Sequence, residues 1–182
     1  MKQESITPHL DVKAFAQSAS ESSGHELLSK YKRLFEETQG LGGDRVLNWS
    51  ARGALQTDEA GIEQVWLHLT VDVSLPLTCQ RCLGPVDIEV AVNRSFRFVG
   101  SEEAAEAQDE ACEEDVLALS PDFSLRELIE DEVLMALPVV ASHDTCPVEV
   151  KLAVADQGFE TASAEKRNPF AVLAKLQGGK SS

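Results

Sequence analysis

Two cysteines separated by two residues, Cys79 and Cys82, stand in the stretch LTCQRCLGPVDIEV, between two segments that alternate apolar and polar residues. Such a pair can bind a metal ion through its thiolates, act as a redox couple, or simply pack in a core. A redox pair of the thioredoxin type opens a helix, which lowers the pKa of the first thiol. Here an alternating strand follows, so redox catalysis is disfavoured, while metal binding and plain packing both stay open.

A tetrahedral structural zinc site needs four ligands, and this pair supplies only two. The segment HDTC, from His143 to Cys146, repeats the two-residue spacing, and Pro147 lies directly behind it. Gly84 is expected to allow the unusual backbone of a tight turn after the first pair. We predict zinc as a structural cofactor if metal is bound, because four protein ligands leave no position for a reactive water. The predicted ligands are Cys79, Cys82, His143 and Cys146.

A sheet is predicted to position the first cysteine pair. The segment EQVWLHLTVDVSLPLT (63–78) alternates strictly, and VDIEVAV (86–92) repeats the alternation after the turn. Period-two alternation of this kind is typical of half-buried strands in antiparallel sheets. The residues expected on the buried face are Val65, Leu67, Leu69, Val71, Val73, Leu75, Val86, Ile88, Val90 and Val92. We therefore expect a largely antiparallel sheet from about 46 to 99.

Three helices are expected to flank this sheet. The segment 25–37 has apolar residues near helical spacing, and the segment 124–137 begins with Ser124 and Glu127, the spacing of a capping box. The segment 169–177 follows an N-cap asparagine and a proline suited to the first helical position. The predicted fold class is α+β, a largely antiparallel sheet flanked by helices, with an acidic mobile loop and a short C-terminal helix.

The chain of 182 residues is expected to form a single domain, 1–182. Its predicted parts are a loose N-terminal leader (1–24), a helix plus antiparallel sheet (25–100), an acidic loop (101–120) and a helical C-terminal part (121–182). Cys112 lies inside the acidic run and is expected to be a free thiol. There is neither a signal-peptide pattern nor an apolar run of membrane-span length, so we expect a cytoplasmic protein without a membrane partner.

The net charge of −15 repels phosphate and anionic membranes and favours a basic partner. The C-terminal segment is the one basic island, and its short helix would not persist alone in water, so it should dock on this protein or on a partner. The candidate partner-binding residues there are Arg167, Asn168, Pro169, Phe170 and Lys175.

The order of these pieces resembles the YceD family, the large ribosomal RNA subunit accumulation proteins. The resemblance covers about 45–177 and rests on LTCQRCLGPV, EDEVLMALP and NPFAVLAKL. It implies a cytoplasmic ribosome-biogenesis protein that supports synthesis, processing or stability of 23S ribosomal RNA. A basic large-subunit ribosomal protein or an assembly intermediate is the implied partner, with ribosomal RNA contacted directly or indirectly. The family offers no catalytic residues to carry over.

The favoured hypothesis is therefore a non-enzymatic factor. The alternatives are an RNA-processing enzyme and a zinc-dependent RNA-binding protein that act directly on the rRNA precursor. An enzyme would need an open metal position or a carboxylate cluster for magnesium, and the dispersed acids of this sequence form no obvious one.

Overall fold

The computed structural model describes residues 9–57, 61–109 and 114–149. Residues up to Cys146 belong to one compact unit, which contains every helix and strand described below, and residues 147–182 belong to a second. The predicted helix 169–177, the candidate partner-binding residues 167–175, and Cys112 lie outside the described residues. Among the described helices, none has the length and apolar character of a membrane span.

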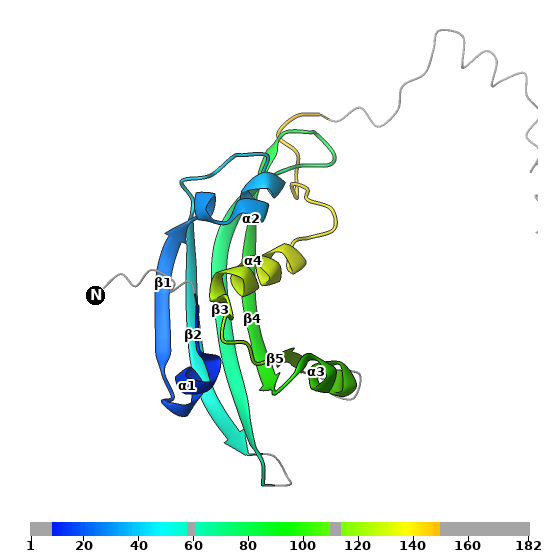
Figure 1. Cartoon of the computed structure of the whole chain (residues 1–182). Coiled ribbons are helices and arrows are strands. Elements are labelled where there is room, and N and C mark those ends of the chain that lie inside the picture. Colours follow the sequence, from blue (N-terminus) through cyan, green and yellow to red (C-terminus); the bar gives the residue numbers. More distant parts are fainter. Residues whose placement is uncertain (1–8, 58–60, 110–113, 150–182) are drawn as a thin grey trace, which may run out of the picture. The chain divides into compact units, whose positions relative to one another are not determined.

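The first unit is built on one five-stranded sheet with the strands in sequence order (Figure 1). Its neighbouring strands are antiparallel except for the last, which runs parallel to the strand beside it. The strands are β1 (Glu21–Leu27), β2 (Val46–Thr57), β3 (Glu63–Thr78), β4 (Pro85–Val99) and β5 (Asp115–Ala118). The predicted antiparallel sheet between 46 and 99 is confirmed as β2, β3 and β4.

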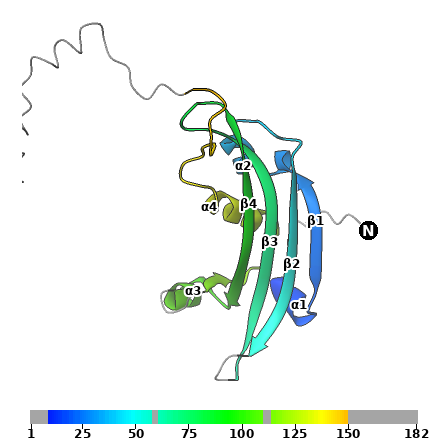
Figure 2. The ribbon, with the colours of Figure 1, turned by 180° about the vertical axis from the view of Figure 1, so that it is seen from behind.

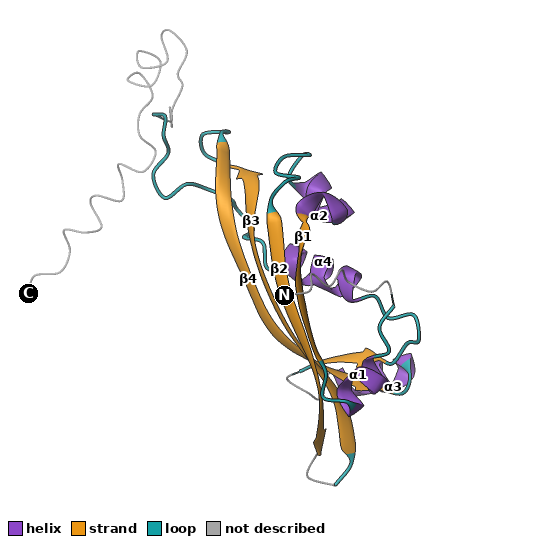
Figure 3. Cartoon of the chain, turned by 90° about the vertical axis from the view of Figure 1, so that its left-hand side faces the viewer, coloured by secondary structure: helices purple, strands orange, loops and turns teal. Residues whose placement is uncertain are grey.

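The helices α1 (Val12–Gln17), α2 (Lys32–Glu37) and α4 (Leu125–Met135) lie on one side of the sheet (Figure 3). Seen from behind, the strands lie in front of α2 and α4 (Figure 2). On β3, all six residues predicted to face the core are at most 8% exposed, because side chains alternate between the two faces of a strand. The predicted fold class, α+β with helices flanking the sheet, is confirmed.

Helix α4 begins as predicted. The hydroxyl of Ser124 accepts a hydrogen bond from the backbone N–H of Glu127 at 3.3 Å, which satisfies one of the unpaired donors of the first turn. Helix α1 approaches the sheet closely at Gly53. A Cβ atom at this position would lie only 2.7 Å from the Phe15 ring and 2.8 Å from Cα of Ala16. Glycine is therefore required where α1 crosses β2.

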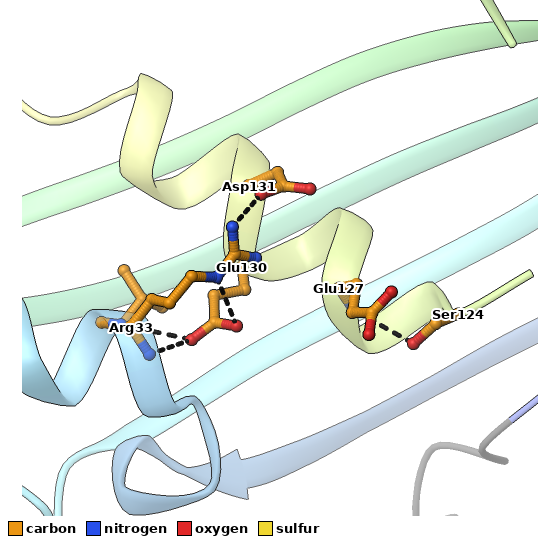
Figure 4. Close-up of polar contacts among 6 residues, drawn as sticks. Arg33, Ser124, Glu127, Glu130 and Asp131 are labelled. Carbon is orange, nitrogen blue, oxygen red and sulfur yellow. Dashed lines mark hydrogen bonds and ion pairs between the residues drawn. The ribbon is translucent and has the colours of Figure 1, made fainter.

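Ion pairs fix α4 to the N-terminal elements (Figure 4). Arg33 on α2 donates its backbone N–H and its Nε to the two carboxylate oxygens of Glu130, at 2.6 and 3.1 Å, and its Nη1 to Asp131 at 2.5 Å. Arg126 donates to Glu26 on β1 at 3.1 Å. Because Glu26 and Glu130 are buried, these contacts are partly shielded from water and set how α4 lies over the sheet.

The prediction of one helix over 25–37 is wrong in its first half. Residues 25–27 end β1, Leu28–Lys30 form a 3₁₀ helix, and only Lys32–Glu37 are α-helical. The backbone of β1 pairs with β2 along its whole length, and Glu26, on β1, is paired with Arg126 from α4. Tertiary pairing therefore overrides the local helical spacing.

Two segments predicted to be irregular contain regular structure. The expected loose leader, 1–24, holds α1, whose first turn is capped by Asp11 accepting from Ala14 N–H at 2.9 Å. The expected acidic loop, 101–120, holds β5 and a further helix, α3 (Glu102–Asp109). Short elements of this kind depend on contacts with the sheet, which their own sequences do not reveal.

Candidate metal centre

Cys79 and Cys82 lie in the tight turn that joins β3 to β4. The N–H of Cys79 donates to the carbonyl of Gly84 at 2.8 Å, and the N–H of Leu83 donates back to Cys79 at 2.9 Å. The residue with the left-handed backbone is Leu83, with φ of +59°, and not Gly84 as expected. Since leucine adopts this conformation only at a cost, the turn holds its shape against a local preference.

His143 and Cys146 come from the segment after α4, which has no regular secondary structure. This segment is joined to the β3–β4 turn by two hydrogen bonds: Gln80 N–H donates to the carbonyl of Ala141 at 2.9 Å, and Arg81 donates to that of Asp144 at 3.3 Å. The turn and the segment are some 60 residues apart in sequence, yet they lie side by side. Together they bring all four predicted donors into one cluster.

The four donors lie close enough together to hold a metal ion, and two of their distances are near those around zinc. Two thiolates bound at about 2.3 Å to a tetrahedral zinc lie about 3.8 Å apart, and a thiolate and an imidazole nitrogen lie about 3.6 Å apart. The observed distances are 3.9 Å between the Sγ atoms of Cys79 and Cys146, and 3.5 Å between Sγ of Cys82 and Nδ1 of His143. All four ligand atoms lie within 4.8 Å of one another.

The surroundings favour a thiolate at Cys79. Burial raises the pKa of this fully buried thiol, but backbone hydrogen bonds, led by those from Cys82 and His143, lower it to about 5. For Cys146, burial and then the contacts with the other two thiols raise the pKa. The lowered pKa favours the thiolate of Cys79, the form in which cysteine binds a metal ion.

The arrangement determines what chemistry these residues can do. Three sulfur donors and one imidazole form a soft set that suits zinc better than magnesium or calcium, which prefer oxygen. Because the protein would fill all four positions, the centre has no open position at which to activate a water. β4 follows the cysteine pair where a redox pair would need a helix, as the sequence indicated.

One feature beside this centre was not predicted from the sequence. A groove of about 660 Å³ lies between β4 and the segment that carries His143. The only available signal was the pair Val139–Val140 directly after Pro138, two apolar residues with no helical or strand pattern around them.

Comparison with known proteins assigns the family. The family model described as "Large ribosomal RNA subunit accumulation protein YceD" matches residues 67–177, from β3 through the cysteine turn, α4 and the HDTC segment. A protein of that name from Haemophilus influenzae is 31% identical over 110 residues, which cover 59% of this chain and 62% of that relative's length. No solved structure matches the chain. Since the family match takes in more than half of the residues, the chain belongs to the YceD family.

Proposed function

We propose that this protein supports the accumulation of large-subunit ribosomal RNA, in keeping with the name of its family, and that this RNA is 23S ribosomal RNA. The observation that carries the proposal is the family match, which runs from β3 across the cysteine turn and α4 and so includes part of the core and all four donors of the candidate metal centre. Ribosome assembly requires RNA and basic proteins to be brought together, and a chain with a net charge of −15 is suited to the protein side of that process.

The role proposed here is non-enzymatic binding. The buried carboxylates that could have formed a catalytic group instead face arginines: Glu26 faces Arg126 at 3.1 Å, and Glu130 faces Arg33 at 3.1 Å. Glu132 lies 3.8 Å from Arg94. Carboxylates that face arginines in this way are poorly placed to hold magnesium against an RNA backbone. The partner we propose is a basic large-subunit ribosomal protein or an assembly intermediate that contains one.

Zinc, in this proposal, is a structural cofactor bound by the two cysteines of the β3–β4 turn together with His143 and Cys146. The support is the closeness of the four donors, two of whose distances are near those around zinc, and the sulfur-rich donor set. The ion would hold the segment after α4 to the end of the sheet, so metal binding would be part of folding at this end.

The test is made in cells and with purified protein. Deletion of the gene should lower the ratio of large- to small-subunit rRNA, and the intact chain should restore it. A tagged chain should co-purify a basic ribosomal protein after nuclease treatment, and purified chain with magnesium should leave precursor 23S RNA uncut. An unchanged rRNA ratio would refute the role, and cleavage abolished by one carboxylate substitution would refute the non-enzymatic mechanism.

A further inference from the structure

We propose that the groove beside the metal centre is a docking site for an extended, basic segment of a partner protein, and that the metal centre sets its shape. The inference rests on the function proposed above and names the surface that would hold the basic partner. One side of the groove is the start of β4, and the other is the segment after α4. Figure 1 shows where β4 and α4 lie in the fold. The lining residues used below are Asp87, Glu89, Val140, His143 and Asp144.

An unpaired sheet edge forms the first side of the groove. β5 pairs with β4 only from Phe96 to Val99, and β3 pairs with the other edge of β4. Within the described residues, the stretch 85–95 of β4 therefore has no strand partner on the groove side. Exposed strand edges present backbone N–H and C=O groups that an extended peptide can pair with, which is a common mode of peptide recognition.

The charge of the groove is negative. Asp87, Glu89 and Asp144 line it and are exposed. Asp87 is paired with Arg45 at 2.8 Å, whereas Glu89 and Asp144 make no ion pair with a described residue. Two carboxylates without an ion pair, beside an open strand edge, favour a segment that carries lysine or arginine.

Apolar side chains also line this groove, and they are Val86, Ile88, Ala136, Pro138 and Val140. Val140 is 57% exposed, and two residues outside the lining, its neighbour Val139 and Met135 at the end of α4, are exposed as well. Exposed apolar residues that gather at one place on a surface are typical of interaction sites. The occupant that matches both features is a segment that alternates basic and apolar residues, since alternate side chains of an added strand point to opposite sides.

The metal centre is coupled to the second side of the groove. His143 is at once a metal donor and a lining residue, and Asp144 and Thr145 lie between the two donors of that segment. Because the segment has no regular structure of its own, the metal would fix where this side lies relative to β4. Metal loss should therefore open the groove without unfolding the sheet.

The test uses a short fluorescent peptide that alternates arginine and valine, and its glutamate–valine counterpart as the control. We expect the basic peptide to bind the zinc-loaded full chain by anisotropy, more weakly as salt rises, while the acidic peptide does not bind. N-methylation of alternate backbone amides of the basic peptide should weaken binding, because those amides could no longer pair with β4. Equal binding of the two charged peptides would overturn the proposal.

Variants of the protein distinguish peptide binding in the groove from binding elsewhere on the surface. Glu89→Lys should weaken binding of the basic peptide about fivefold or more, as expected when a contacting charge is reversed. Asp72→Lys, the same charge change at an exposed site on β3 outside the groove lining, should have little effect. Cys82→Ser should abolish peptide binding while far-ultraviolet circular dichroism stays native.

Each outcome has a distinct meaning. Binding that Glu89→Lys does not reduce would refute the groove, and full binding by Cys82→Ser would refute its coupling to metal. The proposed function fails by a separate readout, an rRNA ratio that does not change on deletion of the gene. Failure of the groove and failure of the function are thus distinguishable.

Discussion

The body of the sheet and its cysteine-bearing end are stabilised by different interactions. In the body, side chains from β3 and α4 such as Leu67, Leu69 and Ile129 are completely buried. At the other end, the buried cluster among the described residues consists of Cys79, Val86 and Ala141. Partly buried residues pack against it, and they are Leu77, Cys82, Ile88 and Cys146. Large apolar side chains therefore stabilise the first region. The second has few of them, and it relies on hydrogen bonds and on four residues that can bind a metal.

Apolar packing alone is too weak to order the cysteine-bearing end of the sheet. Ordering about ten residues of irregular chain costs on the order of 10 kcal/mol in backbone entropy. Burying side chains as small as Val86 and Ala141 contributes only about 2–3 kcal/mol. Binding of a structural zinc ion, worth about 10–16 kcal/mol in small zinc modules, is of the size needed to offset the difference. The body needs no such aid, since each buried leucine or isoleucine contributes about 2–3 kcal/mol.

The largest expected effect on global stability is in the body. Ile129→Ala should lower the free energy of unfolding by about 2–5 kcal/mol, because it leaves a cavity in a fully buried site. Urea unfolding followed by circular dichroism measures the change. The zinc content of the folded variant should equal that of the parent chain. A variant that loses its metal together with its stability would show that the two regions are not separate.

The second-largest expected effect on stability is at the cysteine-bearing end of the sheet. Cys82→Ser should remove the metal and lower global stability by about 2 kcal/mol, roughly 4–8 °C in Tm. Its local effect should be larger: the Gln80 amide, which donates to Ala141 across the centre, should lose most of its protection from hydrogen exchange. The amide of Leu69 in the middle of β3 should keep its protection. Cys112→Ser serves as the matched cysteine control and should change neither metal content nor Tm.

The ion pair between α4 and β1 gives a smaller, pH-dependent effect. Burial acts to raise the pKa of Glu26, but Arg126 and Lys30 outweigh it and hold the pKa below its ordinary value of 4.5. The ionised form therefore stabilises the fold above that value and loses its effect as pH falls through the lowered pKa. Glu26→Gln should cost about 1–3 kcal/mol at pH 7 and almost nothing well below pH 4.5. A cost that does not vary with pH would contradict this account.

Glu132 should show the opposite sign and the smallest effect. Burial raises the pKa of this carboxyl, while Arg94 lowers it in part. Its charge therefore opposes folding once the pH exceeds the raised pKa. Glu132→Gln should stabilise the protein slightly at neutral pH, by less than about 1 kcal/mol, and the gain should shrink as the pH falls through that pKa. Thermal unfolding of both proteins across the acidic range measures the difference.

The two regions also differ in how far their sequences predict them. The strict alternation of β3 predicted its buried face because strand geometry leaves no other choice when one side is apolar. The helical spacing around Glu26 gave a wrong prediction, because Arg126, which pairs with this residue of β1, lies 100 residues further along the chain. Local patterns cannot report such a contact.

At the cysteine-bearing end, the equal spacing of the two donor pairs was enough to predict which side chains meet. It could not predict that Leu83, and not Gly84, carries the left-handed backbone, since either residue can close a turn of this length. Nor could it predict the groove, which exists only because the segment after α4 runs beside an unpaired strand edge.

Metal content is the most direct test of this account. Native mass spectrometry of the untagged full chain, purified without chelators or added metal, should show one zinc ion per chain. The same mass should fall by one zinc in Cys82→Ser and stay unchanged in Cys112→Ser. A parent chain that is metal-free, monodisperse and fully folded, with the Gln80 amide protected from exchange, would contradict the claim that a metal holds this end of the sheet.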